Sequence, residues 1–200
     1  LMPDGHTVLK EDTTFIFRAS ARLRTIDRIT TLTAQTERVD FKDDKEGVFG
    51  MRVARWLEQP EPKTQTFTDS SGKTTQVQKL DDGVASGEYL SSEGIKGDAV
   101  WGTRGRWVLL HAISAGHEIT LAILDHPANP GFPTYWHARG YGLFAANPLG
   151  QKQLSGGKQE LNFSLEPGHS ATFRYSVLIA SGPPSVSQIE AQYQDFTKAK

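Results

Sequence analysis

Residues that could carry acid–base chemistry are concentrated in one stretch of the sequence, residues 125–150. The stretch contains His126 and His137, and Asp125 lies directly before the first of them. Histidine changes its charge near neutral pH, so it can transfer a proton or bind a metal ion. The stretch is rich in aromatic residues and proline, and it lacks helical periodicity and clean strand alternation. A long, stiff loop of this kind is typical of a functional site, and we predict the site here. Hydrogen bonds from the histidines to backbone carbonyls are the structural alternative.

The same stretch supplies residues that suit the recognition of a sugar. Aromatic rings cover the apolar face of a pyranose while a few polar groups bind its hydroxyls. Tyr135 and Tyr141 are the candidates for stacking, and Arg139 could clamp a carboxylate or a pair of hydroxyls. Asn147 and Asp125 complete the expected binding residues. Core packing and structural ion pairs are the alternatives for these side chains.

Two further residues bear on this prediction. In an extended segment Tyr135 and His137 share one face, so we expect Trp136, which takes the other face, in the core. Glu46 precedes a β-like segment, where its carboxylate could act as a base or a metal ligand; a solvated turn is the alternative. The spacing between the histidines is not diagnostic of a metal, and no nucleotide, zinc-protease or EF-hand motif occurs. We therefore assign no metal and no cofactor.

Short β-like segments separated by turns dominate the chain. Their spacing predicts an all-β fold, an antiparallel β-sandwich that forms a single domain over residues 1–200. The expected strands are residues 13–19, 25–35, 46–57, 107–113, 118–124, 162–165 and 171–180. Residues 59–94 are polar and poor in large apolar side chains, so we predict a loop excursion or weak hairpin there.

One helix is expected, over residues 185–198 at the end of the domain. Three apolar residues fall on one helical face there: Ile189, Tyr193 and Phe196. Two prolines precede the segment, and Ser187 with Glu190 fits a capping box at its start.

Composition excludes several classes of protein. The formal net charge is -1, from 22 basic and 23 acidic residues without a basic block, so nucleic acid is not an expected partner. The absence of cysteine excludes disulfides and thiolate catalysis. No apolar run reaches the ~18 residues that span a bilayer. The compartment stays open, with an exported location preferred to the cytoplasm.

Three segments carry a family resemblance: FKDDKEGVFGMRVA, SEGIKGDAVWGTRGRWV and DHPANPGFPTYWHARGYGLFAANPLG. They resemble a bacterial family catalogued as methane oxygenase PmoA-like, and the resemblance covers almost the whole chain except residues 59–87. That family is in turn similar to galactose-mutarotase-like β-supersandwich proteins, whose sites use a histidine and a carboxylate on a sugar ring. A membrane methane monooxygenase subunit would need transmembrane helices, so we expect the family name not to describe the activity.

The resemblance also implies roles for individual residues. Glu46 matches the acidic position of the family's KEG motif. The C-terminal motif of the family is matched by His126, His137, Arg139, Tyr141 and Asn147. Members also carry an upstream segment of the type HHRSLWF, which this sequence lacks, so the resemblance implies that an N-terminal part of the same protein is missing.

The leading hypothesis is a carbohydrate-active protein that performs acid–base chemistry on a sugar or modified glycoside. His137 or His126 would exchange a proton with a ring or leaving oxygen, and Glu46 would be the opposing base. Hydrolase, lyase and epimerase reactions all need this pairing. Two alternatives stay open: a non-catalytic carbohydrate-binding module, and a metal-dependent enzyme that uses both histidines.

Overall fold

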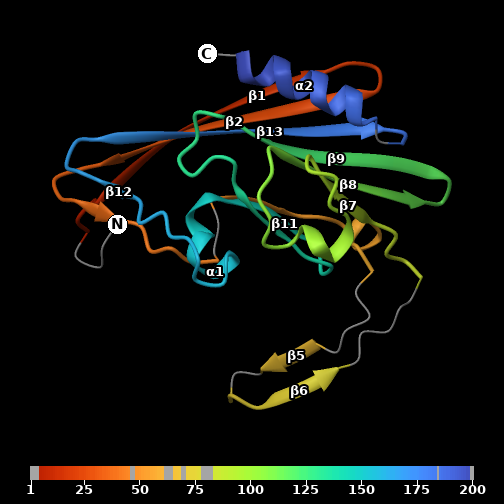
Figure 1. Ribbon diagram of the computed structural model, residues 1–200, viewed down its shortest axis with the longest axis horizontal. Helices are drawn as coiled ribbons and strands as arrows, with labels where there is room; N and C mark the ends of the chain where they lie inside the picture. Colours follow the sequence, from red (N-terminus) through yellow and green to blue (C-terminus); the bar gives the residue numbers. More distant parts are fainter. Residues whose placement is uncertain are drawn as a thin grey trace.

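Most of the expected strands come together in one antiparallel sheet of six strands, as Figure 1 shows for a computed structural model of the chain. The structure describes residues 5–45, 48–60, 65–68, 71–77, 83–183 and 185–198. In order across the sheet, the six strands are β1 (Leu9–Ala19), β2 (Leu23–Ala34), β13 (Ser170–Ser181), β9 (His117–Asp125), β8 (Trp107–Ser114) and β7 (Glu88–Ser91).

A smaller sheet of three antiparallel strands covers part of one face of the large sheet. Its strands, in order, are β10 (Tyr135–Ala138), β11 (Leu143–Asn147) and β4 (Phe49–Arg52). The core between the two sheets is built from large buried side chains, among them Tyr89, Leu110, Ile123, Trp136, Phe144, Phe173 and Tyr175. Burial of these side chains provides the main driving force for folding. The expected all-β sandwich is confirmed.

The opposite face of the large sheet is covered by helix α2 (Val186–Lys198). Ile189 and Tyr193 are buried against Trp107 and Leu124 of the sheet, with Phe196 beside them. The helical face expected from the sequence is therefore confirmed.

The expected capping box at the start of α2 is not formed. The Gln188 backbone N–H is instead bound by Ser185 Oγ at 3.3 Å, two residues before Ser187. Glu190 accepts hydrogen bonds from Trp107 Nε1 and Arg106, so its side chain is directed to the sheet.

Two expected elements differ from the structure. Residues 46–57 do not form one strand: β4 ends at Arg52, and the chain continues into a 3₁₀ turn, η1 (Arg55–Leu57), in which Leu57 is buried. Residues 125–150, expected as one loop, contain β10 and β11 and end in a second 3₁₀ turn, η3 (Pro148–Gly150).

Within the polar region 59–94, the excursion from the sandwich is shorter than expected. Its centre forms the hairpin of β5 (Gln65–Thr68) and β6 (Thr74–Val77), which projects away from the sandwich in Figure 1. Its last part contains β7, which pairs with β8 and belongs to the large sheet.

The remaining elements are short. They are β3 (Val39–Asp40), which pairs with β12 (Ser164–Leu165), the 3₁₀ turn η2 (Gly97–Val100) and helix α1 (Gln151–Leu154). The turn between β8 and β9 uses Ala115 and Gly116, both with positive φ, as a tight hairpin requires. Among the residues that the structure describes, no helix is long and apolar enough to cross a membrane.

Strand β1 lies at the edge of the large sheet and is not covered by the small one. Phe15 and Phe17 of β1 lie on the face of the large sheet that carries the small sheet farther along. They are 52% and 71% exposed and stack on each other at 6.3 Å between ring centroids. The small sheet thus protects the half of the large sheet around β9 and β13 but leaves this edge open.

Candidate functional site

Side chains alternate in direction along β10, and this alternation decides which of them face away from the core. Trp136 and Ala138 are buried between the two sheets, as predicted for Trp136. Tyr135 and His137 therefore face the outer side of the small sheet. The pairing of β10 with β11 places Asn147 opposite Tyr135 and Ala145 opposite His137 on that same outer face.

An open pocket of about 230 Å³ lies on this outer face beside His137. We call it the His137 pocket; its lining residues are Lys45, Phe49, Gly50, Met51, Arg52, His137, Leu143 and Ala145. Gly50 and Ala145 lie opposite each other in the pairing of β4 with β11. A Cβ atom added to Gly50 would approach the Ala145 Cβ to 3.0 Å, so the hollow exists because both residues are small.

His137 forms one wall of the pocket and is held by the backbone. Its Nδ1 lies 3.2 Å from the Lys45 carbonyl oxygen, and its residue is 4% exposed. A carbonyl oxygen can only accept a hydrogen bond, so Nδ1 carries the proton that is donated to it. In the neutral ring, Nε2 then holds the lone pair that a general base uses; this atom is buried, so a ligand must displace neighbouring side chains to reach it.

Arg52 lines the pocket, and Tyr141 lies beside Arg52, outside the residues that line it. The Arg52 guanidinium carbon is 5.2 Å from the centre of the Tyr141 ring, and an Arg52 nitrogen donates to the Tyr141 carbonyl at 3.3 Å. Tyr141 is 36% exposed, so part of its ring is accessible next to the cation. This end of the site combines a fixed positive charge with an accessible aromatic surface.

Asn147 has a different role from the expected one of binding hydroxyls. It is completely buried, and its Nδ2 donates to the carbonyl oxygens of Asp44 at 3.1 Å and Lys45 at 2.6 Å. The same Lys45 carbonyl accepts the hydrogen bond from His137. Asn147 therefore anchors the segment that orients the histidine.

Two further candidates pack into the scaffold. Tyr135 is 6% exposed, lies under the Arg104 guanidinium at 5.3 Å and donates to Gln159 Oε1, which leaves no open face for stacking on a sugar. The Arg139 guanidinium lies 4.4 Å above the Trp101 ring, close to the end of β10.

Asp125 fastens the loop that follows β9. Its carboxylate is fully buried and accepts hydrogen bonds from Asn129 Nδ2 and from the Thr134 backbone N–H, both at 2.8 Å. Asn129 also bonds to both backbone groups of Arg174 in β13. Burial raises the pKa of Asp125 to about 7, although these two hydrogen bonds favour the ionised form.

His126 lies on the other side of the large sheet, under α2. Its ring meets the Phe196 ring edge-on at 5.2 Å, and its Nδ1 accepts a hydrogen bond from the Ala128 N–H at 3.1 Å. Burial lowers the pKa of His126, and the nearby Arg174 adds to this effect. The neutral ring is the form that suits this site.

The predicted residues thus do not form one constellation. His137, with Tyr141 close by, lies at the outer face of the small sheet, whereas His126 lies beyond the large sheet and Asp125 is buried at the end of β9. The two histidines cannot bind one metal ion, and no group of three possible ligands occurs among the described residues. Glu46 lies outside the described residues.

Gly50, Arg52, Ala145 and the Lys45 carbonyl were not among the predicted site residues. Arg52 and Gly50 are two residues apart in β4, so strand alternation places both on one face, but no residue type in the sequence marks that face as a site. The pairing with Ala145, which creates the hollow, depends on the sheet order and has no sequence signal.

The fold and the pocket define an all-β sandwich protein with a histidine-lined hollow on its smaller sheet. The chain belongs to DUF6807, a family of unknown function, whose family model matches residues 1–194. No curated protein and no solved structure matches the chain at a significant level.

Proposed function

We propose that the protein binds a sugar in the His137 pocket and transfers a proton at a ring, anomeric or leaving oxygen of that sugar. The observation that supports this most directly is an imidazole and a guanidinium that line the same open pocket. The proposal agrees with the expected similarity to galactose-mutarotase-like sandwich proteins, in which a histidine acts on a sugar ring.

The chemistry assigns one task to each side chain. Once the sugar displaces the side chains that bury Nε2, His137, with its proton on Nδ1, accepts a sugar hydroxyl proton at that atom and returns it to the ring or leaving oxygen. Arg52 binds a neighbouring hydroxyl, and the exposed part of Tyr141 covers an apolar face of the sugar. The pocket is smaller than the pockets that hold drug-sized ligands, which favours a single sugar ring.

A non-catalytic carbohydrate-binding module is the second candidate. It is favoured by the separation of the histidines, which leaves His137 as the one imidazole of the pocket within the described part of the chain. The two candidates differ in what His137 does: a catalytic His137 controls a rate, whereas a binding His137 controls only affinity.

The test uses freshly dissolved α-D-galactose and α-D-glucose as probes. Polarimetry measures the rate of anomer interconversion, and NMR titration follows the histidine ring signals. Methyl β-D-galactoside and its 4-nitrophenyl analogue test for glycoside cleavage. We expect a sugar to shift the His137 signals, and His137→Gln to lower the rate of the accelerated reaction by about 100-fold, the lower range for general acid–base catalysis.

Two variants sharpen the test. Gly50→Val fills the pocket and should abolish the shifts at His137. His117→Gln, at the exposed start of β9, removes a histidine far from the pocket and should change neither rate nor binding. Sugar binding without any accelerated reaction would establish the binding module. A sugar that shifts no His137 signal would refute both candidates for this pocket.

A further inference from the structure

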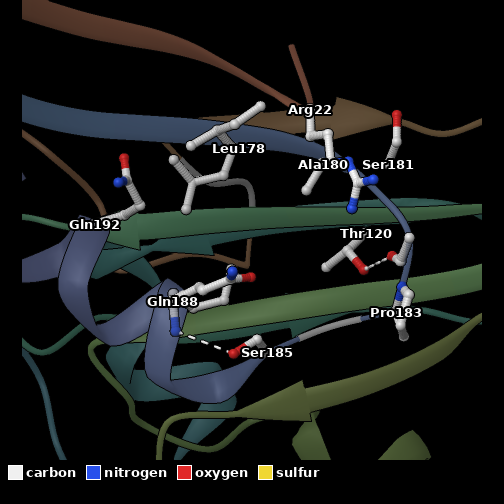
Figure 2. A pocket seen from close by; sticks show the side chains of 12 residues that line it. Arg22, Thr120, Leu178, Ala180, Ser181, Pro183, Ser185, Gln188 and Gln192 are labelled. Carbon is white, nitrogen blue, oxygen red and sulfur yellow. Dashed lines mark hydrogen bonds between the residues drawn. The ribbon is translucent and has the colours of Figure 1, made fainter. Parts of the chain in front are cut away.

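A second pocket lies on the other side of the large sheet, between the first half of α2 and the adjoining ends of β2 and β13. Its volume is about 470 Å³, within the range typical of ligand pockets. We call it the Arg22 pocket. Figure 2 shows Gln188 and Gln192 on the helix side and Arg22, Leu178 and Ala180 on the sheet side.

The pocket exists because α2 does not cover the whole sheet. Ile189 and Tyr193 pack the helix onto β8, β9 and β13, where Leu124 and Leu178 receive them. Toward the C-terminal end of β13 the side chains become smaller, with Ala180 and Ser181 next to Gly182. The helix and the sheet diverge there and leave a hollow with an apolar floor.

The floor and the rim of the pocket differ in chemistry. Leu23, Leu178 and Ile189 provide apolar surface, and Ile189 is 5% exposed. Several polar side chains surround this surface, and the three longest have no side-chain hydrogen bond or ion pair across the described residues: Arg22, Gln188 and Gln192. A mainly apolar hollow with a few polar groups is the usual form of a small-molecule site.

The charge of the pocket selects the class of ligand. Arg22 is the one ionised side chain among the described residues that line it. A guanidinium binds a carboxylate through a bidentate pair of hydrogen bonds, because both groups are planar and their hydrogen-bonding geometries match. One positive charge suits a monoanion, and the apolar floor suits a ligand with a hydrocarbon body.

We propose that the Arg22 pocket binds a small monocarboxylate with an apolar body. Arg22 pairs with the carboxylate, the apolar floor covers the body, and the amides of Gln188 and Gln192 bind polar substituents on it. This site is separate from the His137 pocket, because the large sheet and the core lie between them, and it does not depend on the sugar chemistry proposed there.

The test compares three probes by NMR on the full chain: hexanoate, hexan-1-ol and inorganic phosphate. We expect millimolar hexanoate to shift the side-chain signals of Arg22, Gln188 and Gln192, and hexan-1-ol and phosphate to bind more weakly. Arg22→Gln should weaken hexanoate binding about tenfold, as expected for the loss of a charged hydrogen-bond partner.

Two further variants separate the pocket from general charge effects. Arg24→Gln makes the same change in β2, where Arg24 follows Leu23 of the pocket floor and therefore faces the other side of the sheet; it should leave binding unchanged. Ala180→Phe should fill the hollow and abolish binding, while circular dichroism verifies the fold. The proposal is overturned if hexanoate shifts none of these signals, if hexan-1-ol binds equally well, or if Arg22→Gln and Arg24→Gln have equal effects.

Discussion

At the residue scale, Asp125 is a buried carboxyl group whose role is structural. It accepts two hydrogen bonds that hold the loop between β9 and β10, yet burial raises its pKa to about 7. An acid with a raised pKa in the folded state binds protons more tightly there than in the unfolded chain. Its contribution to stability therefore decreases as the pH rises from about 4 to about 7, the interval between its unfolded and folded pKa values.

This gives a testable pH dependence. Asp125→Asn removes the titration but places an amide N–H₂ against donors, so the variant should be less stable at every pH and should lose less stability between pH 5 and pH 8. Urea unfolding of both proteins at the two pH values measures the difference. Equal losses in the wild type and the variant would show that the Asp125 carboxyl titrates alike in both states.

Individual residues also show which features of the site the sequence could not predict. Asp125 and His126 are neighbours, and strand alternation directs such neighbours to opposite faces. Their neighbours come from distant segments: Tyr175 of β13 is the cross-strand partner of Asp125 within the large sheet, and Phe196 of α2 lies against His126. The sequence could therefore name the chemically capable residues but could not show which of them meet.

At the element scale, α2 and β10 show the two outcomes of pattern reading. The helix was predictable because one face is apolar, one face is polar, and two prolines precede it. Strands β10 and β11 were not predicted, because nearly all of their residues are buried and the alternation of apolar and polar residues is lost. A single strand over residues 46–57 was wrongly predicted, because the apolar pattern of β4 continues into η1.

The attachment of α2 to the sheet can be measured. Ile189→Ala removes a buried side chain and should lower the free energy of unfolding by about 2 to 4 kcal/mol. Val186→Ala, a matched change at a position that is 50% exposed, should stay within about 0.5 kcal/mol of the wild type. Chemical denaturation compares the two, and equal effects would contradict the packing of α2 through Ile189.

At the scale of the whole molecule, β1 is an edge strand of eleven residues that carries two exposed aromatic rings. An edge strand can take up a strand from another chain; the charged residues Lys10, Glu11, Asp12 and Arg18 of β1 oppose this, whereas the exposed Phe15 and Phe17 favour it. We therefore predict that the chain self-associates through β1 as its concentration rises. Phe17→Lys should suppress this association, as sedimentation velocity would show.

The matched control for this change is Ile113→Lys, which replaces another exposed apolar residue, 50% exposed, at the far end of β8. It should leave the association unchanged. If both lysine variants reduce association equally, general surface hydrophobicity, and not the edge of β1, holds the copies together.

The β5–β6 hairpin gives the molecule a convenient attachment point. Its turn residues 71–73 are exposed, and the hairpin projects away from the sandwich in Figure 1. Since the chain contains no cysteine, Ser71→Cys would introduce its single thiol. A fluorophore or surface tether placed there would report tumbling or immobilise the protein in one orientation, with the sandwich left chemically untouched.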